Sequence, residues 1–212
     1  NTQPVMLTAG IACYRAWVAD TGLLPDVVAG HSLGEYSALV AAGALTLADA
    51  LPLVRLRAQA MQEAVPVGAG AMAAILGLDA DAVRAGCDEA QRASGAKRAL
   101  PLPVSAPFHC SLMKPAAERL KLALAGVAVA PPVLPVVNNV DVKAETAPDA
   151  IRDALYRQSY GPVRWVEVVQ ALRSRGLQHV IECGPGKVLS GLVKRIDGEM
   201  ISMTLLDPTS LN

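Results

Sequence analysis

Cysteine is scarce and widely spaced in this sequence of 212 residues. The four cysteines, Cys13, Cys87, Cys110 and Cys183, form no Cys-x-x-Cys pair. Zinc sites and disulfide scaffolds need more closely organised cysteines, so the spacing argues against both. We therefore expect reduced thiols, no bound metal and a cytoplasmic protein.

The sequence also lacks a charge excess and any long apolar segment. Lys plus Arg total 19 and Asp plus Glu total 19, so the net charge is zero. A nucleic-acid-binding protein would instead carry a clustered basic excess. Charges, Gly or Pro interrupt every apolar run well before the roughly 20 residues that a membrane span needs, and we expect no signal peptide. Hydrophobic residues nevertheless make up 52% of the chain, which predicts a folded protein with a sizeable core.

Helical and strand-like patterns alternate along the chain. Thr46 with Asp49 three residues later predicts a helix start, and Gly22 and Gly43 predict helix ends. Helices are predicted at residues 5–19, 33–42, 46–64, 79–90, 115–124, 149–157, 163–174 and from the turn at 184–186 to 196. Strands are predicted at residues 27–29, 71–76, 99–105, 133–140 and 179–181. This alternation indicates an α/β fold with a mainly parallel sheet.

The motif Gly30-His31-Ser32-Leu33-Gly34 lies between a predicted buried strand and a predicted helix. Gly-x-Ser-x-Gly in this context is typical of a nucleophile elbow, in which a strained turn projects the serine hydroxyl above the sheet. We expect both glycines to be needed because side chains there would clash with the strand and helix. The helix N-terminus offers free N–H groups to an oxyanion, and Leu33 would donate one of them. The alternative is a plain strand–helix turn.

A serine nucleophile needs a base, and the sequence has only three histidines. His31 neighbours the serine and should point away from it. His179 begins a predicted buried strand, where a hydrogen-bonded core histidine is the commoner outcome. His109 follows Pro107 in a segment without strong helix or strand preference, so elimination makes it the base. It lies about midway along the chain, unlike the late histidine of α/β-hydrolases.

Arg57 is the second informative residue. It shares one helix face with Leu53 and Met61, at spacings of four residues. A guanidinium in an apolar stripe must find a partner, because an unpaired buried charge costs several kcal/mol. Three outcomes stay open: an internal salt bridge, a side chain that reaches out to water, or a bidentate grip on a substrate carboxylate.

Beyond these features, the sequence resembles the malonyl-CoA:acyl carrier protein transacylase family along nearly its whole length. The resemblance rests on these segments: Gly30-His31-Ser32-Leu33-Gly34-Glu35-Tyr36, Arg57 with Met61-Gln62-Glu63-Ala64-Val65-Pro66, Leu100-Pro101-Leu102-Pro103-Val104-Ser105-Ala106-Pro107-Phe108-His109-Cys110, Val136-Val137-Asn138-Asn139-Val140-Asp141, and Glu182-Cys183-Gly184-Pro185-Gly186-Lys187-Val188-Leu189.

The resemblance implies a role for each matching residue. Ser32 would carry the malonyl group, His109 would be its base, and the backbone carbonyl of Gln158 would orient that histidine. Arg57 would hold the malonyl carboxylate, and Leu33 would supply an oxyanion-hole amide. The remaining implied residues line the pocket: Met61, Val188 and Phe108, the last of which would exclude a 2-methyl branch. Malonyl-CoA and acyl carrier protein would be substrate and partner, with no cofactor, nucleic acid or membrane, and we expect a monomer.

The resemblance also implies a domain organisation. Residues 1–67 and 107–212 would form a hydrolase-like α/β main domain, and residues 68–106 a small ferredoxin-like subdomain. Family members have a first strand and a Gly-Gln-Gly loop that this sequence does not show, and their small subdomain is longer. Either these segments are deleted or they lie outside the 212 residues, and we expect the second.

Other functions stay open at this point. The chain is alternatively a serine hydrolase or thioesterase, or a non-catalytic domain that docks carrier proteins. More remote readings are a thiol enzyme using Cys110 or Cys183, and a phosphate loop at Gly184-Pro185-Gly186.

Overall fold

The computed structural model describes residues 2–66, 70, 72–76, 82, 98–101 and 106–205, with the backbone alone for residues 73–76 and 98–101. The elements are α1 Thr2–Thr21, β1 Val28–Ala29, α2 Gly34–Ala41, α3 Leu47–Glu63, β2 Ala73–Leu76, β3 Arg98–Pro101, η1 Ser111–Met113, α5 Lys114–Ala125, β4 Val136–Val137, α6 Pro148–Tyr160, α7 Trp165–Ser174, β5 His179–Cys183, α8 Val188–Ile196 and β6 Ile201–Leu205.

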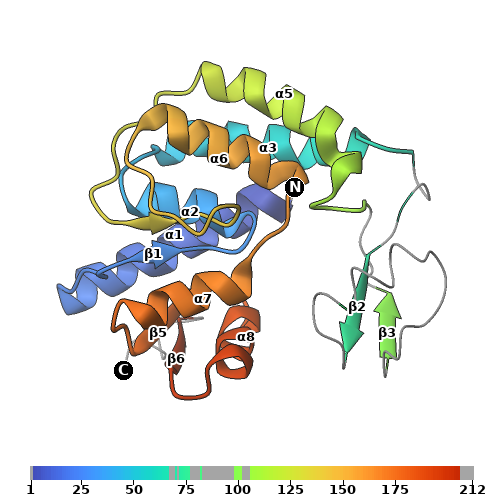
Figure 1. Ribbon diagram of the computed structural model, residues 1–212. Helices are drawn as coiled ribbons and strands as arrows, with labels where there is room; N and C mark the ends of the chain where they lie inside the picture. Colours follow the sequence, from blue (N-terminus) through green and yellow to red (C-terminus); the bar gives the residue numbers. More distant parts are fainter. Residues whose placement is uncertain are drawn as a thin grey trace.

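The strands pair in the way that an α/β fold requires. β1 pairs with β4 and β5 pairs with β6, both in parallel, and helices connect the partners along the chain. β2 and β3 pair antiparallel and lie apart from the main group of helices in Figure 1. The predicted α/β fold is confirmed, although the described strands form three separate two-stranded sheets.

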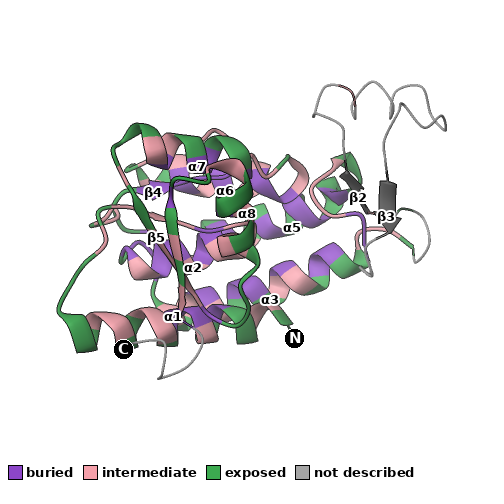
Figure 2. Cartoon of the chain, turned by 90° about the horizontal axis from the view of Figure 1, so that it is seen from below, coloured by how far each residue is buried: buried purple, intermediate pink, exposed green. Residues whose placement is uncertain are grey.

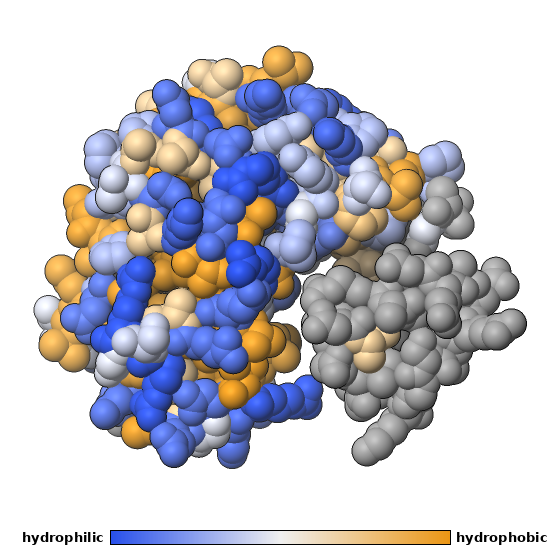
Figure 3. Space-filling view, viewed as in Figure 1, coloured by the Kyte–Doolittle hydropathy of each residue, from blue (hydrophilic) through white to orange (hydrophobic). Residues whose placement is uncertain are grey.

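The core lies between the helices and the parallel strands. One apolar cluster joins α1, α2, α3, α5 and α6 through residues such as Leu7, Leu39 and Leu120. A second cluster lies under α7, whose buried face carries Trp165, Val168, Val169 and Leu172 at helical spacing. In Figure 2 the buried residues lie along the inward faces of the helices. Figure 3 shows polar and apolar residues interspersed on the face of the molecule that it presents.

Several local predictions are confirmed. The Thr46 Oγ1 accepts a hydrogen bond from the Asp49 N–H at 3.0 Å and so caps α3. Gly22 and Gly43 have φ values of +68° and +71° just after α1 and α2, a conformation that glycine adopts at little cost. The helix predicted at residues 46–64 is α3, which continues through Pro52.

Other local predictions were wrong. The strand predicted at residues 133–140 shrinks to β4. Before β4, Pro135 cannot donate to a ladder, and after it the N–H groups of Asn138 and Asn139 donate to the Lys143 carbonyl and the Glu35 carboxylate instead of to a strand. β6 was not predicted, and His179 is exposed rather than buried. The helix predicted at residues 79–90 lies largely outside the described residues. Within the described ranges, no helix is both long and apolar enough to cross a membrane.

Candidate active site

The turn after β1 places Ser32 in a strained backbone conformation. Ser32 has φ +52°, a left-handed value that is uncommon for residues other than glycine and that concentrates at functional sites. A Cβ at Gly30 would lie 2.0 Å from the carbonyl carbon of Gly34, so Gly30 must be glycine. A Cβ at Gly34 would meet nothing within 4 Å, so the expectation that both glycines avoid a clash was wrong for Gly34.

Ser32 and His109 form the hydrogen bond that nucleophile and base require. The Ser32 Oγ lies 2.7 Å from the His109 Nε2, and the Nδ1 of the same ring lies 3.0 Å from the backbone carbonyl oxygen of Gln158. With the proton on Nδ1 donated to that carbonyl, Nε2 is free to accept the serine proton. The carbonyl therefore takes the orienting place that an aspartate has in a Ser-His-Asp triad.

The surroundings keep the His109 ring neutral. Burial, and next the positive charge of Arg57, lower the pKa of His109 to about 4. A histidine with this pKa is unprotonated near pH 7, which is the state a general base needs. His31 lies against Trp165 in an edge-to-face contact, with ring centroids 5.6 Å apart, as expected for a packing residue.

Arg57 reaches the same site from α3. Its side chain is 2% exposed, on the buried face that also carries Leu53 and Met61, so it does not reach out to water. The guanidinium donates to the Ser32 Oγ at 3.0 Å, to the Gln158 Oε1 at 3.0 Å and to the Gln3 Oε1 at 2.9 Å. These partners are neutral oxygens, and among the residues that the structure describes no carboxylate forms a direct ion pair with the guanidinium beside Ser32. Such a charge suits a carboxylate on the acyl group.

The backbone after Ser32 supplies a candidate oxyanion donor. The Leu33 N–H makes no hydrogen bond within the part of the chain that the structure describes, whereas the Gly34 N–H donates to the His31 carbonyl. Leu33 directly precedes α2, where the helix N-terminus adds partial positive charge. The geometry therefore agrees with the predicted place of an oxyanion.

The predicted pocket residues differ in exposure. Met61 is 1% exposed and belongs to a small apolar cluster against which Phe108 packs. Val188 is 70% exposed at the start of α8, which makes it the most exposed of the predicted site residues. The structure thus places Met61 and Phe108 near one another and leaves Val188 at the surface.

Sequence reasoning missed three polar residues at this site. Gln3 contacts Arg57, and Asn139 accepts from the Ser32 N–H at 2.7 Å. Glu35 is 2% exposed and accepts from the Asn139 N–H and from the Gln158 Nε2. For Glu35 a signal was available, because it is the one charged residue of α2, and a charge on a helix that is largely buried has to be paired.

The structure speaks against two remote readings. Burial raises the pKa of Cys183 to about 11, and the Cys110 Sγ donates to the Pro107 carbonyl, so neither is a poised thiolate. At the α8 N-terminus the Glu182 carboxylate already accepts from the Leu189 and Ser190 N–H groups, which removes the donors of a phosphate loop. Among the residues that the structure describes, no group of three or more potential metal ligands occurs.

Comparison with known proteins gives concordant results. A family model described as "Acyl transferase domain" matches residues 1–92. A malonyl CoA-acyl carrier protein transacylase of Escherichia coli (strain K12) is 48% identical over 243 aligned residues, covering 100% of this chain and 79% of that protein. The chain belongs to the malonyl CoA-acyl carrier protein transacylase family.

Solved structures of transacylases agree in fold. The crystal structure of an acyl-carrier-protein S-malonyltransferase from Burkholderia pseudomallei 1710b is similar with a TM-score of 0.95 and 58% identity, over 100% of this chain and 79% of that one. A malonyl-transacylase solved in complex with its type II PKS acyl-carrier protein has a TM-score of 0.96 and 45% identity, over 99% of this chain and 78% of that one. The alignment with the Escherichia coli transacylase spans more positions than the 212 residues of this chain, so that relative has residues without a counterpart here.

Proposed function

We propose that the protein transfers a malonyl group from coenzyme A to the phosphopantetheine thiol of acyl carrier protein, through a malonyl ester on Ser32. The observation that carries the proposal is the meeting of Ser32, His109 and Arg57. The Ser32 hydroxyl lies within hydrogen-bond distance of both a neutral histidine and a buried guanidinium. The family relationship and the names of its members support transfer to a carrier protein over plain hydrolysis.

Acylation would proceed in two bond changes. His109 Nε2 takes the Ser32 proton as the Oγ attacks the thioester carbonyl, whose oxygen then carries a negative charge near the Leu33 N–H. The C–S bond breaks, and the coenzyme A sulfur leaves with the proton from His109. Arg57 holds the far carboxylate, so the carbonyl is presented to Ser32 in one orientation.

Transfer would run the same steps in reverse with a second thiol. His109 takes the proton of the phosphopantetheine thiol, its sulfur attacks the malonyl ester, and the C–O bond to Ser32 breaks. The proton returns from His109 to the Ser32 Oγ. Water must be kept from the ester meanwhile, because hydrolysis releases free malonate.

Several finer points belong to the same proposal. Met61, Phe108 and Val188 would line the acyl pocket, with the bulk of Phe108 limiting branched acyl groups. Residues 1–67 and 107–212 would form a hydrolase-like main domain and residues 68–106 a ferredoxin-like subdomain. The pathway would be fatty acid or polyketide synthesis, in the cytoplasm, by a monomer without a cofactor.

Mass spectrometry tests the proposal directly. The protein is mixed with malonyl-CoA, and peptides are mapped for the malonyl group. We expect one adduct on Ser32, absent in Ser32→Ala, and its disappearance when reduced acyl carrier protein in the phosphopantetheine form is added. Release of free malonate without formation of malonyl carrier protein would favour a thioesterase. If no adduct formed at all, the proposed malonyl ester on Ser32 would be refuted.

A further inference from the structure

Glu35 is a buried carboxylate that the proposed chemistry does not use. It lies in the first turn of α2 and is 2% exposed. Its Oε2 accepts a hydrogen bond from the Asn139 N–H at 2.8 Å and from the Gln158 Nε2 at 3.1 Å. Burying a carboxylate costs free energy unless it accepts hydrogen bonds, so the burial of Glu35 depends on these two contacts.

The hydrogen bond from Gln158 connects Glu35 to Arg57. The Gln158 amide donates from Nε2 to Glu35 and to the Ser32 carbonyl oxygen at 2.9 Å, and its Oε1 accepts from Arg57 at 3.0 Å. If this amide turned over, its NH₂ group would face the guanidinium and its oxygen would face the carboxylate. The Glu35 carboxylate and the Ser32 carbonyl together therefore select the one amide orientation in which Gln158 accepts from Arg57.

The hydrogen bond from the Asn139 N–H connects Glu35 to Ser32. The Asn139 backbone is held by Glu35, while its side-chain Oδ1 accepts from the Ser32 N–H at 2.7 Å and its Nδ2 donates to the Gly30 carbonyl at 2.8 Å. The Asn139 side chain thus bonds the elbow on both sides of His31. These bonds help to hold Ser32 in its left-handed conformation.

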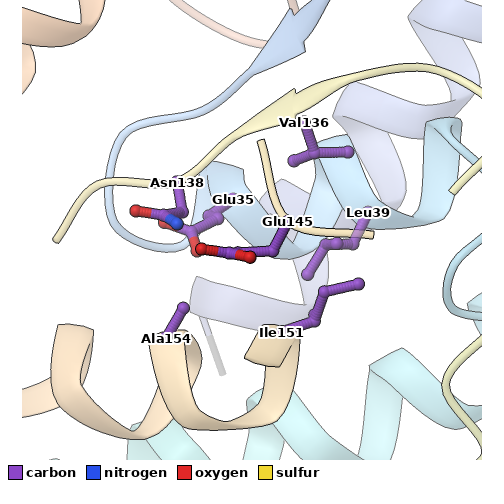
Figure 4. Close-up of a pocket in the computed structure, with 7 residues that line it drawn as sticks. All are labelled: Glu35, Leu39, Val136, Asn138, Glu145, Ile151 and Ala154. Atoms are coloured by element: carbon purple, nitrogen blue, oxygen red, sulfur yellow. The ribbon is translucent and has the colours of Figure 1, made fainter. Parts of the chain in front are cut away.

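The cavity beside Glu35 offers no place for a substrate. Figure 4 shows the polar ends of Glu35, Asn138 and Glu145 together, with Leu39, Val136 and Ile151 on the apolar side. The cavity measures about 10 Å³, which is room for about one water molecule. Any influence of Glu35 on the reaction must therefore pass through the protein.

We propose that Glu35 is a positioning residue. By accepting hydrogen bonds from Gln158 and Asn139 at once, it fixes the positions of the Arg57 guanidinium and the Ser32 backbone relative to one another. This inference deepens the proposed function and rests on it. Loss of the acceptor would leave the Gln158 Nε2 with the Ser32 carbonyl alone, so Gln158 would hold Arg57 less firmly in place for a carboxylate. Malonyl transfer should then suffer more than transfer of uncharged acetyl.

The test compares kcat/KM for malonyl-CoA and acetyl-CoA in three variants. Glu35→Met removes the acceptor, Glu35→Asp withdraws it by one methylene, and Glu35→Gln keeps an acceptor oxygen. We expect the malonyl-to-acetyl ratio to fall about tenfold in Glu35→Met, the effect of one hydrogen bond to a charged group, and to fall less in Glu35→Asp. Glu35→Gln should restore most of the ratio.

Leu39→Ala is the matched control, since Leu39 lies one turn along α2 and is also 2% exposed. It should lower Tm without changing the ratio. If Glu35→Met does not fold, the malonyl-to-acetyl ratio of Glu35→Asp tests the inference in its place. An unchanged ratio in the folded variants, or a loss in Glu35→Gln as large as in Glu35→Met, would overturn the inference.

A stability measurement separates this inference from the proposed function. Thermal unfolding is followed for Glu35→Met, Gln158→Met and the double variant. We expect the double variant to lose less Tm than the two single variants summed, because both remove the same contact. Additive losses would overturn the positioning role even in a protein that forms malonyl-Ser32, whereas a missing adduct with non-additive losses would refute only the proposed function.

Discussion

Arg57 donates a hydrogen bond from Nη2 to the Oγ of Ser32 across 3.0 Å. The same hydroxyl lies 2.7 Å from the Nε2 of His109, the proposed base. The group proposed to recognise the acyl carboxylate is therefore in contact with the atom proposed to form the acyl bond. Recognition and reaction share one hydroxyl, so changes at Arg57 should alter both substrate choice and the titration of the base.

Arg57→Ala should discriminate between acyl groups. Loss of the buried partner of a carboxylate should cost roughly 2–5 kcal/mol in malonyl binding, while acetyl-CoA should lose much less. Steady-state kcat/KM with both thioesters measures the difference. Equal losses would mean that Arg57 only supports the fold.

The acid side of the pH profile should report His109. Its pKa of about 4 means that the base stays unprotonated, and kcat/KM stays high, until the pH falls toward that value. Because the charge of Arg57 contributes to lowering this pKa, Arg57→Met should raise it and move the acid limb to higher pH. Acetyl-CoA is the substrate of choice for this comparison, since it does not need the guanidinium. An unmoved limb would show that burial alone sets the pKa.

The two glycines of the elbow should respond oppositely to alanine. In Gly30→Ala the new Cβ would lie 2.0 Å from backbone atoms of Gly34, so the turn must shift and Ser32 acylation should fall roughly 100-fold. Gly34→Ala meets nothing within 4 Å at the first position of α2 and should raise the free energy of unfolding by about 0.5–1 kcal/mol. Adduct formation and chemical denaturation measure the pair. Similar acylation in both variants would contradict the clash.

Glu35 should make stability depend on pH. Burial raises the pKa of Glu35 from 4.5 to about 7 in the folded protein. Between these values the folded state keeps a proton on Glu35 that the unfolded state has lost, so the contribution of Glu35 to the free energy of unfolding should fall as pH rises and level off above about 7. The shift corresponds to roughly 3 kcal/mol. Denaturation of the wild type and of Glu35→Gln from pH 4.5 to 8 measures this contribution as the difference between their free energies of unfolding, in which the opposite contribution of His109, whose pKa is lowered, cancels. The difference should fall as pH rises, and a difference that does not change with pH would contradict the prediction.

Contacts between near neighbours could be predicted from the sequence by itself. The elbow around Ser32, the Thr46 cap and the buried stripe of α7 all depend on residues a few positions apart, where backbone geometry dictates the spacing. His109 was predicted as the base by elimination among three histidines, and the Gln158 carbonyl as its partner by family resemblance. The structure places the His109 ring in contact with both the Ser32 hydroxyl and the Gln158 carbonyl. The short β4 and the extra strand β6 were missed because strand pairing depends on distant partners.

Only the tertiary structure decided the partners of the buried polar groups. Arg57 could have formed a salt bridge, and the fold instead gives it Gln158, 101 residues away. Ser32 meets Asn139 across 107 residues and the Gln158 side chain across 126. No local pattern encodes such pairs, because each depends on how helices and strands pack. The sequence alone therefore determined a serine elbow in an α/β protein, and packing determined which amides and which carboxylate hold that serine and its arginine in place.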